Sequence, residues 1–132
     1  MPFPLERRHL YSRQLTVDIR IDIEPPGRII GHLREGAVET TVTSGNSSAA
    51  ATALVHALLQ AKTEGDSQCF WHEPTGQYWW MFRLDGALLE VVVLWSSGTV
   101  TGWQHVFRAA DEVDHLIERV REELAKNGLT AP

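Results

Sequence analysis

The chain has 132 residues, of which 43% are hydrophobic and 22% are charged, so it is long enough to bury a substantial core. Its length predicts a single α+β domain spanning residues 1–132. The formal net charge of −5 argues against a nucleic-acid-binding protein, because neutralising phosphate groups requires a basic face.

Composition also bears on the compartment. No segment approaches the roughly 20 consecutive apolar residues of a membrane-spanning helix, and the first residues lack the apolar stretch of a signal peptide. The only cysteine, Cys69, excludes an internal disulfide and fits a reducing compartment. We therefore expect a cytoplasmic protein with no membrane partner.

The N-terminal third predicts three strands. Apolar residues alternate with polar ones from Leu15 to Glu24, which is typical of a strand with one buried face. Pro25, Pro26 and Gly27 end this strand, because proline cannot donate to a ladder and glycine turns freely. Two further strands follow at 28–33 and 37–43, with a turn between them.

Two helices are predicted. The first begins after a loop at 44–48, where a serine hydroxyl caps it, and it ends at Gly65. The second runs from Asp111, its predicted cap, to Lys126. Apolar residues recur at helical spacing in both: Ala50, Leu54, Ala57, Leu58 and Ala61 in the first, and Val113, Leu116, Ile117, Val120 and Leu124 in the second.

The segment Gln77–Phe107 is the most informative stretch of the chain. Two aromatic and β-branched runs flank Asp85-Gly86, which is a strong hairpin signal, and a third run follows a further turn at Ser97-Gly98. A strand at 67–72 precedes this meander. The element order is β-β-β-α-β-β-β-β-α, which indicates an α+β fold with a mainly antiparallel sheet of six to seven strands and two helices on one face.

The expected loops set the register of the meander. We assume two-residue loops at Asp85-Gly86 and Ser97-Gly98, and a four-residue loop at 73–76. One face is then almost wholly apolar and forms the core under the helices. Its expected pairs are Phe82 with Leu89, Trp80 with Val91 and Tyr78 with Val93, extended by Trp71 and Cys69 on one side and by Val106, Gln104 and Gly102 on the other.

The opposite face carries the candidate site. Exposed aromatic side chains around a few polar groups are typical of a recognition surface, and this register places Glu90 beside His105. Leu88 and Phe107 lie at the margin of the face. The candidate binding residues are Phe70, Trp79, Met81, Arg83, Glu90, Trp103 and His105.

Three interpretations of this face remain open. The N-terminal strands cover it and make Glu90–His105 a buried pair, or it is a homodimer interface, or it binds a foreign ligand. A small-ligand or acid–base site would use Glu90, His105 and Arg83 together, with the arginine steadying an anion.

No cofactor or catalytic residue is expected. Cys69 and His72 point to opposite faces of their predicted strand and cannot easily share a metal ion, which usually needs four ligands in a closed zinc site. The Cys69 thiol falls on the core face with no base beside it, where it behaves as a small hydrophobic group.

One layout runs from Trp71 through Gly76, Trp79, Arg83, Asp85-Gly86 and Trp95 to Phe107 and closes with an amphipathic helix. This layout resembles small uncharacterised bacterial α+β proteins of the polymorphic-toxin immunity type. The resemblance covers about residues 69–126. It implies a non-enzymatic protein that binds another protein, of the immunity or regulatory kind, and it carries over no catalytic residue. The alternative is a homodimeric structural or small-ligand-binding domain with a Glu-His-Arg site on the open sheet face.

Overall fold

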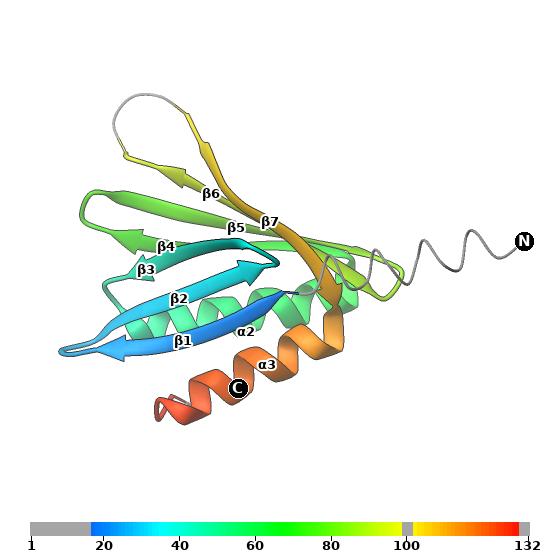
Figure 1. Cartoon of the computed structure of the whole chain (residues 1–132), viewed down its shortest axis with the longest axis horizontal. Helices are drawn as coiled ribbons and strands as arrows, with labels where there is room; N and C mark the ends of the chain where they lie inside the picture. Colours follow the sequence, from blue (N-terminus) through cyan, green and yellow to red (C-terminus); the bar gives the residue numbers. More distant parts are fainter. Residues whose placement is uncertain (1–16, 99–101, 130–132) are drawn as a thin grey trace, which may run out of the picture.

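The computed structural model describes residues 17–98 and 102–129 (Figure 1). The strands of this part are β1 (Asp18–Glu24), β2 (Arg28–Glu35), β3 (Val38–Ser44), β4 (Asp66–Glu73), β5 (Gly76–Asp85), β6 (Leu88–Ser96) and β7 (Gln104–Glu112), and its helices are α2 (Ser47–Glu64) and α3 (Val113–Lys126). The predicted α+β class and element order are confirmed. The predicted strand residues Leu15 and Thr16 and the first residues of the third meander strand, 99–101, lie outside the described ranges.

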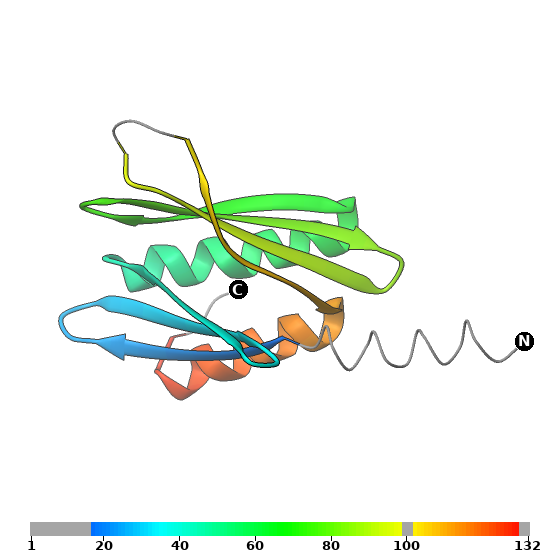
Figure 2. The ribbon, with the colours of Figure 1, turned by 45° about the horizontal axis from the view of Figure 1, so that its top comes forward.

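The strands form two antiparallel sheets. One sheet has the order β1-β2-β3 and the other has the order β4-β5-β6-β7. In Figure 2, α2 lies between the two sheets and α3 runs beside β1. Both helices therefore lie on the same side of the four-stranded sheet, and its other face points away from them.

The core between the sheets contains the side chains that the sequence periodicity predicts. Val17, Ile19 and Ile21 on the first strand are buried, and so are all the apolar positions predicted for the two helices. Trp71 joins the layers. A Cβ placed on Gly31 of β2 would lie 3.5 Å from its ring, and its Nε1 donates to the Ala50 carbonyl of α2 at 3.1 Å. No helix in residues 17–98 and 102–129 is long and apolar enough to span a membrane.

The prediction that a serine caps the first helix is wrong, because α2 already includes Ser47 and Ser48. Asn46 is the N-cap, and its side-chain oxygen accepts from the Ala49 N–H at 3.1 Å. Asparagine is as favourable as serine at this position. The predicted stop at Gly65 is confirmed, with φ at 97°, a left-handed conformation that glycine adopts without a steric penalty.

The prediction that Asp111 caps the last helix is wrong. Strand β7 continues to Glu112, and α3 begins at Val113. The Asp111 carboxylate instead accepts from the Val17 N–H at 3.3 Å and contacts Nδ1 of His115 at 2.8 Å. Asp111 therefore ties the start of β1 to the β7–α3 corner.

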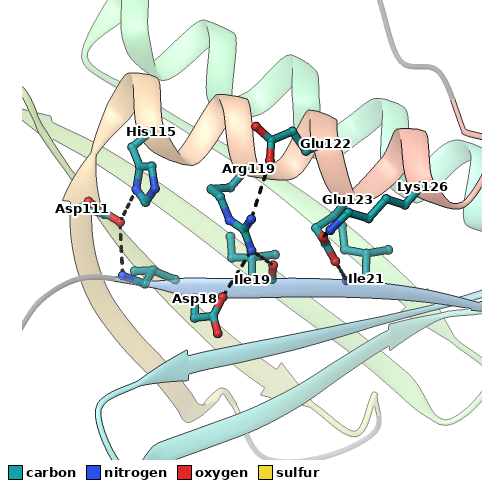
Figure 3. Close-up of polar contacts among 10 residues, drawn as sticks. Asp18, Ile19, Ile21, Asp111, His115, Arg119, Glu122, Glu123 and Lys126 are labelled. Carbon is teal, nitrogen blue, oxygen red and sulfur yellow. Dashed lines mark hydrogen bonds and ion pairs between the residues drawn. The ribbon is translucent and has the colours of Figure 1, made fainter.

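Side chains of α3 occupy the outer edge of β1 (Figure 3). Glu123 accepts from the Ile21 N–H at 2.9 Å, and Arg119 donates to the Ile19 carbonyl at 3.3 Å. Asn127, which follows the helix, donates to the Ile21 carbonyl at 2.6 Å. An exposed strand edge is a template for pairing with another chain, and these contacts satisfy that edge from within the molecule.

The β5–β6 register differs from the prediction by two residues. Asp85 pairs with Leu88, so the two-residue loop is Gly86-Ala87, and Gly86 has φ at 63°. Glycine at the first loop position is the pattern of a type II′ turn. Phe82 consequently lies opposite Val91, Trp80 opposite Val93 and Tyr78 opposite Trp95. A shift of two residues preserves which face each side chain occupies, so the predicted core face of both strands is correct.

The β6–β7 pairing contains a β-bulge. Val93 pairs with Phe107 but Leu94 pairs with His105, which leaves Val106 as the extra residue. Phe107 and Ala109 are therefore the buried residues of β7. The prediction that Phe107 lies on the open face is wrong, because the bulge inserts a residue before it. Val106 packs against the core as predicted, and Gln104 pairs with Trp95 on the predicted core face but is exposed there.

Candidate functional site

The candidate site is the face of the four-stranded sheet that points away from α2 and α3, which we call the open face. Its side chains alternate with the buried ones along each strand, so Phe70, Trp79, Met81 and Val92 on it are only half-buried. A sheet face that contains large apolar residues and is not covered is typical of an interaction site.

An aromatic cluster of Phe70, Trp79 and Trp103 occupies one end of the open face. The ring centroids of Trp79 and Trp103 are 5.1 Å apart, and that of Phe70 lies 5.7 Å from Trp79 and 6.3 Å from Trp103. The Trp79 indole N–H donates to Oε1 of Gln68 at 2.8 Å. The rings hold one another in place, while the side chain of Trp103 remains 39% exposed.

The other end of the open face is charged. Arg108 donates to Oε2 of Glu90 through Nη2 at 2.7 Å and through Nε at 3.2 Å. Arg83 pairs with Glu90 in the β5–β6 register, yet its side chain forms no hydrogen bond or ion pair with any residue in 17–98 or 102–129. Two shallow grooves of about 520 and 480 Å³ share Arg83 and Glu90 in their walls.

The predicted contact between Glu90 and His105 is wrong. Glu90 pairs with Ala110, and His105 pairs with Leu94, which is four residues further along β6. Four residues of strand span about 13 Å. The bulge and the longer β6–β7 connection cause this separation, and a Glu-His-Arg site is therefore not assembled in the structure.

The structure thus divides the predicted site residues into separate groups. Phe70, Trp79 and Trp103 come together as predicted. Met81, Arg83 and Glu90 line one groove, whose wall also includes Gln68 and Val92. His105 is exposed on the same face, near the aromatic end.

Arg108, the actual partner of Glu90, is not among the predicted site residues. The period-two alternation of buried Phe107 and Ala109 with exposed Arg108 was the available signal. The predicted register instead follows from a two-residue loop at Ser97-Gly98, and that register places Phe107 on the wrong face.

Cys69 and His72 lie as the sequence predicts, on opposite faces of β4. Cys69 is buried and His72 is exposed. Burial raises the pKa of the Cys69 thiol to about 12, which keeps it protonated and unreactive at neutral pH. Within the described ranges, no three side chains of His, Cys, Asp or Glu are placed to hold a metal ion together.

Comparison with protein-family models, with curated proteins and with solved structures finds no match to this chain. The resemblance to immunity-type proteins therefore stays a prediction from sequence.

Proposed function

We propose that this chain is a non-enzymatic protein-binding domain and that the open face is its binding surface. The observation that carries the proposal is the aromatic cluster, which leaves Trp103 exposed beside two half-buried rings on the sheet face that points away from α2 and α3. Tryptophan is enriched among residues that dominate interface energies. The Arg108–Glu90 pair and the Arg83 side chain at the charged end would orient a partner, because complementary charges fix the register of two proteins.

Placing the protein in the immunity or regulatory class rests on the sequence resemblance alone. The open face fits that class, because such a protein acts by occupying a surface of its partner, without chemistry of its own. A toxin-like protein captured at the open face would support this finer assignment, and a metabolic enzyme captured there would favour the regulatory one.

Site-specific photocrosslinking tests the proposal. A photoreactive phenylalanine analogue replaces His105, which is exposed on the open face. The matched control replaces Val38, which is 58% exposed on the other sheet. We expect crosslinks to protein from position 105 and none from position 38.

Adding Trp103→Ala should weaken the capture at position 105 by roughly 2 kcal/mol or more, since the exposed ring would be an interface anchor. Equal crosslinking from positions 105 and 38, or capture that is insensitive to Trp103→Ala, would contradict the proposal.

A further inference from the structure

The cross-strand registers arrange the open face in rows of side chains that run from β4 through β5 and β6 to β7. From the charged end, the rows are Asp66–Arg83–Glu90–Ala110, Gln68–Met81–Val92–Arg108, Phe70–Trp79–Leu94–His105 and His72–Gln77–Ser96. The pattern has one property that a binding surface for an unrelated protein does not need: it is complementary to itself.

Self-complementarity appears when two copies are placed face to face about a two-fold axis parallel to the strands, between β5 and β6. Such an axis places each β5 side chain against the β6 side chain of the same row in the other copy, and β4 against β7. Contacts of this isologous kind occur twice in a dimer.

The central contacts then match in chemistry. Arg83 meets Glu90 of the partner subunit, Met81 meets Val92 of the partner subunit, and Trp79 meets Leu94 of the partner subunit. Within one chain, Arg83 has no ion-pair partner among the described residues, whereas Glu90 is already ordered by Arg108 and keeps a side chain that is 35% exposed. The second copy would supply the acidic group that Arg83 lacks.

The outer contacts introduce no repulsion. Gln68 meets Arg108 of the partner subunit, and Asp66 meets Ala110 of the partner subunit with that same arginine one row away. An axis perpendicular to the strands would instead bring Arg108 against His105 and Arg83 against Gln77. The distribution of charge therefore selects the axis along the strands.

We propose that the open face binds a second copy of this chain, face to face, about a two-fold axis parallel to the strands between β5 and β6. The inference rests on the proposed function and names the partner. Four strands about 4.8 Å apart and seven residues in length form a face roughly 20 Å by 20 Å. Counted on both copies, this face buries roughly 800 Å², which is below the about 1,200 Å² of stable interfaces, so we expect a weak dimer that dissociates on dilution.

Sedimentation velocity over a concentration series tests the inference. The wild-type chain should change from monomer to dimer as its concentration rises. Arg83→Glu and Glu90→Arg should each weaken self-association about tenfold or more, because each places like charges together twice per dimer. The matched control for Arg83→Glu is Arg121→Glu on α3, an exposed arginine away from the open face, which lowers the net charge by the same amount and should associate like the wild type.

Mixing the two variants gives the decisive result. In a pair formed by one Arg83→Glu chain and one Glu90→Arg chain, both central contacts again join opposite charges, so the equimolar mixture should recover the dimer. Circular dichroism of each variant checks that it is folded. A monomeric wild type, variants that associate normally, or a mixture of folded variants that stays monomeric would each overturn the inference.

The photocrosslink at position 105 separates this inference from the proposed function. A crosslink between two copies of the chain supports both. A crosslink only to a different protein overturns the homodimer and leaves the binding function standing, while no crosslink to any protein removes both.

Discussion

Gly76 begins β5 at a point where another strand approaches very closely. A Cβ at this position would meet the backbone carbonyl oxygen of Ser96 and lie 2.8 Å from the ring of Trp95. The Trp95 ring also packs on Tyr78, with centroids 4.6 Å apart. Glycine is required here because a side chain would force apart the β5–β6 pair, not because of the backbone conformation.

We expect Gly76→Ala to lower the free energy of unfolding by about 1–3 kcal/mol, the usual cost of inserting atoms into a packed site. Urea denaturation followed by circular dichroism measures the change. Gly27→Ala is the matched control, because the new Cβ would have only Ser47 Oγ nearby, at 3.8 Å. A Gly76→Ala protein as stable as the control would show that the two strands can separate here at little cost.

Helix α3 acts at the scale of an element by closing the edge of β1. Glu123 is 3% exposed and accepts from both the Ile21 N–H and Nζ of Lys126. Burial alone would raise the pKa of this carboxyl, but the hydrogen bonds from Lys126 and Ile21 and the charges of Lys126 and Arg119 outweigh it and lower the pKa below the ordinary value of 4.5.

A lowered pKa in the folded state means that the ionised Glu123 stabilises the fold above its unfolded pKa, and that this contribution is lost as the pH falls through the folded value. Glu123→Gln should therefore cost roughly 1–3 kcal/mol at neutral pH, because it weakens buried hydrogen bonds to a charged group. The difference from the wild type should shrink below about pH 4.5.

Denaturant unfolding at a series of pH values measures both effects of Glu123→Gln. Glu122→Gln is the control, because Glu122 is exposed and its ion pair with Nη1 of Arg119 is long, at 3.6 Å. A difference between wild type and Glu123→Gln that stays constant down to low pH would mean that the carboxylate charge does not hold α3 to β1.

At the scale of the whole molecule, Trp71 links the two sheets through α2. It is 1% exposed, and its ring lies 5.0 Å from that of Trp80. Removing it would open a cavity between the layers, whereas removing the exposed Trp103 would not.

We expect Trp71→Ala to destabilise the protein by about 3–5 kcal/mol, in the range of large core truncations. Trp103→Ala should change stability by less than about 1 kcal/mol, because the ring is partly exposed outside the core. Fluorescence and circular dichroism should report coincident unfolding transitions for both variants. Separate transitions for the two sheets in Trp71→Ala would show that they fold independently.

Local patterns were sufficient to predict much of this protein. Alternation identified the buried residues of β1, helical spacing identified those of α2 and α3, and turn residues ended every element except β7, which runs directly into α3. The predicted faces of β5 and β6 are correct although their predicted pairing differs from the observed one by two residues, because side-chain direction repeats every second residue. On that basis Phe70, Trp79 and Trp103 were correctly brought together.

The tertiary structure alone decided the rest, because it depends on distances that no local pattern encodes. The bulge at Val106 reversed the parity of β7 from Phe107 onward and, with the longer β6–β7 connection, brought Arg108 rather than His105 to Glu90. The division of seven strands into two sheets, and the use of Asp111 and Glu123 to hold β1, arise from packing between segments about 100 residues apart in sequence. Composition and periodicity determine which side chains are buried in the core. Only the packing of the layers determines which polar groups meet and which sheet face stays open.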